Sequence, residues 1–291
     1  MSLVVARRIA DEVRIISDTK ISNPLALHKT PLTGALKCIV VSPTCCISFV
    51  GNVYIAERAL TPLLQGAIFT RRELTSYLLG QHRQHGCQTD FIVATVGEAT
   101  AIDRISMGSL EEGLPSAWIG DVEAFEAYQA NYHTMLTRRQ ASPYFEERFR
   151  IAAAMSDALA AVIDESSIES VGDFTVSVRA QPAQGDGFRY LSRAFGSGFK
   201  PVANTKEETS LTQSVGVEGG SYHYCILVPA AVGVGALAVH IREARLGILF
   251  FPARSWTSIL LKGLDTESFI HEIRARFGIT FDGLRNLSEG A

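Results

Sequence analysis

The first part of the chain holds two largely apolar strand pairs, with an acidic residue directly after the first pair and a lysine inside the second. Residues 2–6 and 13–17 are mostly apolar and are joined by a polar turn, and Asp18 follows directly. Lys37 lies inside the apolar run 35–41, where a lysine is seldom found without a partner. The sequence therefore predicts two β-hairpins. It also predicts an ion pair between Asp18 and Lys37.

Ser2 is the second feature of this region. Small second residues generally permit removal of Met1, and we expect it to be removed here. Ser2 would then carry a hydroxyl and a free α-amine, whose ordinary pKa of about 7.7–8.0 suits a base near neutral pH. A hydroxyl paired with an N-terminal amine is a known activated nucleophile. A chain can also begin with Met-Ser and a strand without using Ser2 chemically, so these residues alone leave both interpretations open.

Several motifs occur in a fixed order along the first two thirds of the chain. Asp18 lies sixteen residues after Ser2, within the segment Ser17-Asp18-Thr19-Lys20-Ile21-Ser22. Lys37 opens a strand, and Ser48-Phe49-Val50-Gly51 ends the next one before a helix. Further matching segments are residues 91–96, 102–105 and 116–120. In this set the chain resembles, over about residues 2–180, the proteasome β-subunit family of N-terminal nucleophile (Ntn) hydrolases, including its bacterial proteasome-like branch. Ser17 stands where that family usually has glycine.

The resemblance implies an α+β fold, a four-layer αββα sandwich with a C-terminal β-rich extension. Residues 2–180 would form the Ntn-hydrolase core. Residues 181–291 would add strands that complete the sandwich, a mobile loop at 196–221 and a terminal helix. The loop could gate a cleft or be a solvated insertion.

The local sequence pattern gives the same order of elements. We expect the hairpins at 2–22 and 36–51 to be adjacent antiparallel strands of one sheet. Helices are expected at 56–65, 71–85, 122–138, 145–164 and 266–277. Further strands are expected at 90–97, 100–107, 117–119, 174–179, 188–195, 222–228, 236–244 and 246–251. The order differs from the strand–helix alternation of parallel α/β folds.

What the resemblance implies for chemistry is an N-terminal serine peptidase or amidase. Ser2 Oγ would attack an amide carbonyl, Lys37 held by Asp18 would supply a positive charge, and the Gly51 N–H would face the oxyanion. Lys20 and Ser22 would contact an extended peptide substrate. The expected partners are a peptide or protein substrate and further copies in a ring of at least six, with an ATPase partner left open. The alternative is a non-catalytic proteasome-like ring or scaffold subunit.

Composition and sequence pattern argue against a nucleic-acid-binding, membrane-spanning or secreted protein. Of 291 residues, 47% are hydrophobic, and the formal charge is −3. The chain therefore lacks the excess of basic residues that indicates a nucleic-acid-binding protein. No apolar run has the roughly 20 residues that span a bilayer, and no signal-peptide pattern is present. Five cysteines without a CxxC pair indicate reduced thiols and a cytoplasmic protein. We expect no cofactor.

Weaker candidates for chemistry lie outside the Ser2 region. His82 and His85 with Cys87 suggest a metal site only weakly, so we expect no metal. Cys45 and Cys46 are expected to be core residues and are the reserve nucleophiles. Asp121 is expected to cap the helix that follows it.

Overall fold

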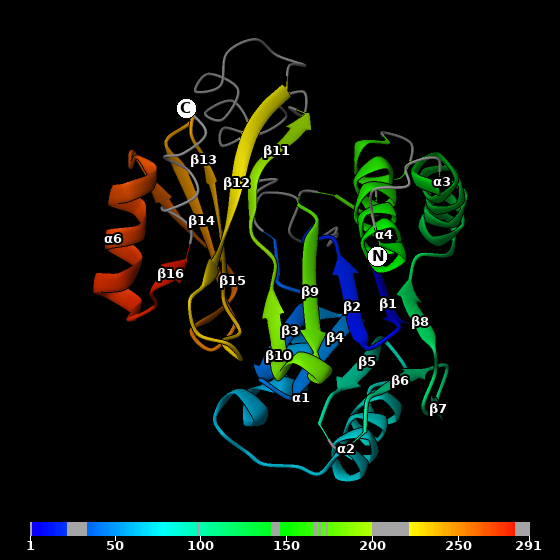
Figure 1. Cartoon of the computed structure of the whole chain (residues 1–291). Helices are drawn as coiled ribbons and strands as arrows, with labels where there is room; N and C mark the ends of the chain where they lie inside the picture. The colour runs from blue at the N-terminus through cyan, green and yellow to red at the C-terminus, as the bar shows by residue number, and fades with distance from the viewer. Residues whose placement is uncertain are drawn as a thin grey trace.

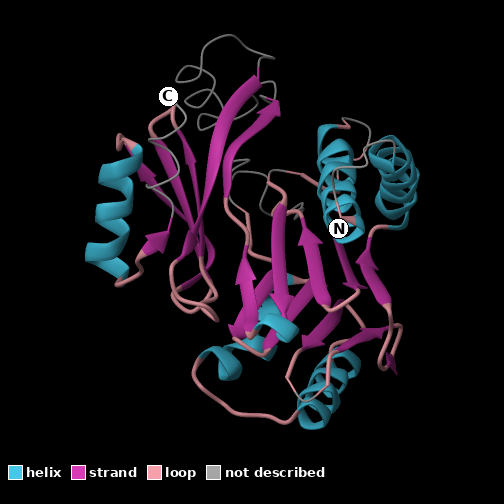
Figure 2. Ribbon diagram, viewed as in Figure 1, coloured by secondary structure: helices cyan, strands magenta, loops and turns pink. Residues whose placement is uncertain are grey.

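The computed structural model describes residues 2–21, 34–97, 99–140, 146–165, 168, 170–172, 174–199 and 221–282. In these ranges the chain is mixed α and β, with five α-helices and three antiparallel sheets. Figure 1 shows the elements with their labels, and Figure 2 shows the same view by secondary structure. No helix in the described ranges is long and apolar enough to cross a membrane.

The first sheet has the strand order β10-β9-β2-β1-β8. Its strands are β1 (Leu3–Ile9), β2 (Glu12–Ser17), β8 (Ser116–Gly120), β9 (Val176–Gln181) and β10 (Asp186–Tyr190), with a 3-10 helix (Pro182–Gln184) between the last two. The β1–β2 turn includes Ala10 in the left-handed region, at φ 54°. One face of this sheet packs on α3 (Val122–Gln140) and α4 (Glu147–Asp164). These two helices lie side by side in Figure 1.

The second sheet has the strand order β3-β4-β5-β6-β7. Its strands are β3 (Cys38–Ser42), β4 (Cys45–Gly51), β5 (Thr89–Thr95), β6 (Ala101–Ser106) and β7 (Ser109–Glu111). One face packs on α1 (Val53–Leu64) and α2 (Arg71–Gln84). Helix α2 begins with a capping box in which Thr70 and Glu73 satisfy each other's backbone N–H groups, which explains why the sequence located its start.

The remaining faces of the two sheets share one apolar core. Val4 and Ile15 of the first sheet belong to the same buried cluster as Cys46 and Ile92 of the second. Tyr190 reinforces this contact, because its hydroxyl donates to the Cys38 carbonyl (2.8 Å) and accepts from the Val40 N–H (3.1 Å). Both faces of each sheet are therefore covered, and alternate residues along a strand enter different clusters.

The third sheet has the order β11-β12-β13-β14-β15, with β16 paired to β12. Its strands are β11 (Arg193–Phe199), β12 (Ser221–Pro229), β13 (Leu237–Ile241), β14 (Leu246–Phe251), β15 (Ser255–Lys262) and β16 (Phe281–Asp282). Helix α6 (Thr266–Phe277) covers one face through the buried Phe269. Phe250, on the other face of β14, joins the core shared by the first two sheets.

The structure corrects the expected arrangement of the two hairpins. The prediction that 2–22 and 36–51 are adjacent in one sheet is wrong, because β1–β2 belongs to the first sheet and β3–β4 to the second. The neighbours of the first hairpin are β8 and β9, which come from much later in the chain. An apolar pattern indicates that a strand is buried but does not determine which strand pairs with it. Here the two hairpins pack face to face in the core and do not share a sheet edge.

The C-terminal third also differs from the expectation. Of its strands, only β10 joins the first sheet, while β11 to β16 form the separate third sheet instead of completing a two-sheet sandwich. The expected strand 188–195 is two strands, β10 and β11, and β15 was not predicted. Of the expected loop 196–221, residues 196–199 and 221 belong to β11 and β12. Residues 200–220 lie outside the described residues.

Candidate active site around Asp18

The Asp18 carboxylate is fully buried and accepts hydrogen bonds from several parts of the chain. Its Oδ1 accepts from the Leu3 N–H (3.1 Å). Its Oδ2 accepts from the Lys20 N–H (3.1 Å), the Gly172 N–H (3.3 Å) and Lys37 Nζ (2.7 Å). A buried charge is tolerated when it is paired and hydrogen-bonded, and this set meets both conditions. The carboxylate therefore ties the start of β1 to Lys37 and to the segment before β9.

Lys37 is the cation of this cluster and is 2% exposed. Its Nζ donates to Asp18 and also to the Lys20 carbonyl (2.5 Å). The Lys37 carbonyl accepts from the Phe49 N–H (3.0 Å), so the lysine lies beside the end of β4, where Gly51 follows two residues later. The predicted ion pair is thus present, and it joins the first sheet to the second.

Ser2 immediately precedes β1 and is 5% exposed. The next residue, Leu3, is fixed by Asp18 on one side and pairs with Gly120 on the other. The Ser2 carbonyl accepts from the Asp121 N–H (2.8 Å). Ser2 is consequently held at the end of the strand by hydrogen bonds on both sides of its peptide plane.

Gly120 permits this close approach. Its φ is +123°, and a Cβ there would lie 1.9 Å from the Ser2 carbonyl oxygen. Asp121 then caps α3, since its Oδ1 accepts from the Ala124 N–H (3.1 Å), as the sequence predicted.

Gly120→Ala is expected to destabilise the chain by at least about 2 kcal/mol, because the backbone conformation is strained for alanine and the Ser2 strand must move. Gly80→Ala is the matched control. Gly80 lies within α2, and a Cβ there would meet no atom within 4 Å beyond its own helix backbone, so the same added methyl should stabilise by about 0.5–1 kcal/mol. Urea unfolding of both variants measures the difference. Equal stability of the two variants would contradict the geometry at Ser2.

Gly51 has the corresponding place at the end of β4. Its φ is +103°, and a Cβ would lie 2.1 Å from the Gln88 carbonyl oxygen. Asn52 follows it and caps α1 by accepting from the Tyr54 N–H (3.0 Å). At both positions a strand therefore ends in a glycine, and the residue after the glycine caps the following helix.

Two predicted substrate residues have different outcomes. Lys20 contributes its main chain to the cluster, through its N–H and carbonyl, and its aliphatic side chain lies against Gly172. Ser22 lies outside the described residues. Gly172 itself was not predicted as a site residue, because only the folded chain brings its N–H to Asp18.

The reserve nucleophiles are poor candidates in the structure. Burial raises the pKa of Cys45 to about 12 and raises the pKa of Cys46 well above its ordinary value. Both are therefore thiols, not thiolates, at neutral pH, and the thiolate is the nucleophile. Cys46 is part of the core shared by the first two sheets.

The histidine candidate for a metal site has a structural role. Both ring nitrogens of the buried His82 are engaged, Nδ1 with the Thr89 carbonyl (2.7 Å) and Nε2 with the Gly108 N–H (2.8 Å). Since a carbonyl only accepts and an N–H only donates, His82 carries its hydrogen on Nδ1. Among the described residues no group of three or more His, Cys, Asp or Glu side chains could hold a metal ion.

Comparison with known proteins finds no family model that matches the chain and no curated protein that matches it.

Proposed function

We propose that the chain is a proteasome-like Ntn hydrolase that cleaves amide bonds with Ser2, once the residue before Ser2 has been removed. The observation that carries this proposal is the buried Asp18 carboxylate, which binds the Leu3 N–H and Lys37 Nζ at the same time. A lysine and an aspartate used only for stability could be replaced by apolar residues at little cost. This ion pair is also hydrogen-bonded to Leu3, the residue after Ser2, through Asp18, and this position favours a chemical role for the pair.

The proposed reaction runs in two steps. Ser2 Oγ attacks the amide carbonyl carbon while its proton passes to the Ser2 α-amine, directly or through a water. The resulting ammonium donates a proton to the leaving amine, which leaves an ester between Ser2 and the acyl group. Water then hydrolyses that ester with the α-amine again as base.

Lys37 and Gly51 have distinct proposed parts. The positive charge of Lys37, fixed at the Ser2 end of β1 through Asp18, lowers the pKa of the α-amine and favours ionisation of the hydroxyl. The N–H of Gly51, at the strand end beside Lys37, faces the developing oxyanion. Lys20 lines the path of an extended peptide.

The arrangement of the sheets supports the same assignment. We interpret α3 and α4, the first sheet, the second sheet, and α1 and α2 as the four layers of an αββα sandwich, with the third sheet and α6 as its extension. In this proposal the protein acts in the cytoplasm on peptides or unfolded proteins and assembles as a homo-oligomeric ring of at least six copies. Light scattering of the purified protein measures the mass of the assembly and so the number of copies in it.

The test compares two forms of the protein that differ only before Ser2. One is released from a fusion so that Ser2 is the first residue, and the other keeps a glycine-methionine extension. We expect the first form alone to hydrolyse peptide-amide reporters and to be acylated at Ser2 by a β-lactone probe, read by mass spectrometry of the N-terminal peptide. Equal activity in both forms would overturn the Ser2 mechanism. No activity and no acylation in either form would favour the non-catalytic ring subunit.

A further inference from the structure

The buried His82 joins the end of β5 to the turn between β6 and β7. His82 lies near the end of α2 and is fully buried. Its Nδ1–H donates to the Thr89 carbonyl (2.7 Å), and its Nε2 accepts from the Gly108 N–H (2.8 Å). The pairing of β5 with β6 begins at Phe91, opposite Ile105, so the Thr89 carbonyl lies beyond that ladder. The imidazole thus supplies the hydrogen bond that a longer β6 would otherwise give.

Thr89 is the residue directly opposite Gly51 in the sheet. On this side of the pair, the Asn52 N–H donates to the Gln88 carbonyl (3.0 Å), and Thr89 Oγ1 donates to the Asn52 carbonyl (3.1 Å). A backbone bond between the flanking residues 52 and 88 makes Gly51 and Thr89 a non-hydrogen-bonded pair, whose N–H groups point away from each other. The Gly51 N–H therefore points away from β5.

The opposite side of β4 is the side of Lys37. Successive N–H groups of a strand point to alternate sides, so the N–H groups of Phe49 and Gly51 point the same way. The Phe49 N–H donates to the Lys37 carbonyl (3.0 Å). The Gly51 N–H thus points to the side on which the Asp18–Lys37 pair lies, and its direction depends on how the backbone of residues 88 and 89 holds the end of β4.

We propose that His82 is a positioning residue for amide hydrolysis. By holding the Thr89 carbonyl, it fixes the backbone of Gln88 and Thr89 against Gly51 and so directs the Gly51 N–H toward the oxyanion. The two backbones are in close contact, since a Cβ on Gly51 would lie 2.1 Å from the Gln88 carbonyl oxygen. A shift of residues 88 and 89 therefore moves Gly51 as well. This inference rests on the proposed function, in which the Gly51 N–H contacts the oxyanion.

Two variants separate the two hydrogen bonds of the ring. His82→Asn has an N–H donor at the position of Nδ1 and no atom at that of Nε2, so it keeps the bond to Thr89 and loses the bond to Gly108. His82→Gln has its side-chain oxygen at the position of Nε2, so it keeps the bond to Gly108 and loses the bond to Thr89. Each variant loses one hydrogen bond, and urea unfolding should show similar losses of stability.

Hydrolysis of the peptide-amide reporter by chains that begin at Ser2 should distinguish these variants. His82→Gln should lower kcat at least about tenfold with little change in KM, because an oxyanion donor acts in the transition state and its complete loss costs about 10²–10³ in kcat. In His82→Asn the bond to Thr89 remains, so kcat should stay within about threefold of the parental value. A role in stability alone predicts equal kcat for the two variants.

Hydrogen exchange gives a second measurement that does not require activity. The Asn52 N–H is bonded to the Gln88 carbonyl and exchanges when the end of β4 separates from β5. Mass spectrometry of the peptide that contains Gly51 and Asn52 should show at least about tenfold faster exchange in His82→Gln than in His82→Asn. Equal exchange in the two variants would overturn the positioning role.

His240→Gln is the matched control. His240 is another buried histidine, and its ring nitrogens bond to the Leu264 carbonyl (3.0 Å) and the Thr266 hydroxyl (3.0 Å). It belongs to β13 of the third sheet. Its replacement should lower stability and leave kcat at the parental value.

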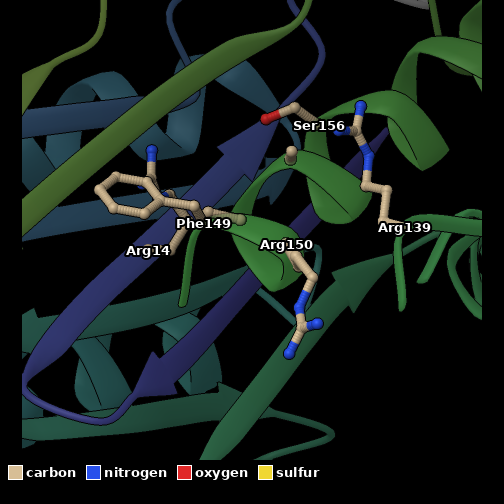
Figure 3. Close-up of a pocket in the computed structure, with 7 residues that line it drawn as sticks. Arg14, Arg139, Phe149, Arg150 and Ser156 are labelled. Atoms are coloured by element: carbon tan, nitrogen blue, oxygen red, sulfur yellow. The ribbon is translucent and has the colours of Figure 1, made fainter. Parts of the chain in front are cut away.

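Phe149→Ala is a second control, at a place away from the second sheet. Phe149 lines a cavity of about 410 Å³ beside Arg14, which Figure 3 shows at the first turns of α4. The residues that line this cavity include neither His82 nor Gly51. Phe149→Ala removes more side-chain volume than His82→Gln does, and it should also leave kcat at the parental value.

The outcomes separate this inference from the proposed function. Equal kcat in His82→Asn and His82→Gln, with an active parent chain, would overturn the role of His82 and leave the Ser2 mechanism in place. An inactive parent chain would overturn the proposed function and the role of His82 in hydrolysis with it. If His82→Gln does not fold, Thr89→Val replaces it, since it removes the hydroxyl bond to Asn52 at the same strand end. A parental kcat in Thr89→Val would then overturn the inference.

Discussion

Ser2→Ala, in a chain that begins at residue 2, is expected to lower amide hydrolysis by about 10⁴-fold or more, the range found when a catalytic nucleophile is removed. The α-amine remains in this variant, so the loss of activity measures the contribution of the Ser2 hydroxyl. Stability should change by less than about 1 kcal/mol, because alanine keeps the hydrogen bonds of the Ser2 carbonyl and the Leu3 N–H. Reporter hydrolysis and urea unfolding on one preparation measure both quantities.

A second variant, Ser2→Thr, tests whether the base is the α-amine. The proposed base is the amine and not the side chain, so a threonine hydroxyl should retain at least partial activity. Activity in Ser2→Ala equal to that of the parent would show that another nucleophile performs any hydrolysis observed. Inactivity of both variants with a large loss of stability would show that Ser2 is a packing residue.

Lys37→Met is expected to destabilise the chain by about 3–5 kcal/mol, because it leaves the fully buried Asp18 carboxylate without its cation. It should also abolish hydrolysis, since the charge near Ser2 is lost. Denaturant unfolding gives the first effect and the peptide-amide reporter gives the second.

A double variant separates these two effects. Asp18→Asn combined with Lys37→Met removes both charges, and its stability loss should be smaller than the sum of the single losses because the pair is coupled. Its activity should remain absent. Activity restored together with stability would mean that the ion pair only supports the fold.

Arg71→Met is the matched control for Lys37→Met. Arg71 pairs with Asp103, another fully buried carboxylate, which also accepts from the Gly113 N–H (2.9 Å). This pair belongs to α2 and β6, away from the Ser2 end of β1. Arg71→Met should therefore lower stability while leaving hydrolysis at the parental rate for the folded fraction.

Much of the local structure could be predicted from the sequence because its signals are local. The capping residues Thr70, Asp121 and Asp265 mark where helices begin, and each accepts a hydrogen bond from a backbone N–H of the first turn. The Asp18–Lys37 pair was predictable for another reason: a lysine in an apolar strand requires an acid, and the sequence places one at the end of the first hairpin.

Only the tertiary structure decided which strands are neighbours. The two early hairpins face each other across a core instead of sharing an edge, and the late strands form a third sheet. A period of two along a strand tells which residues are buried, but buried residues on both faces fit several neighbours equally well. The hydrogen bond from the Gly172 N–H to Asp18 follows from that choice. It depends on β9 pairing with β2 across more than half of the chain, which no local pattern specifies.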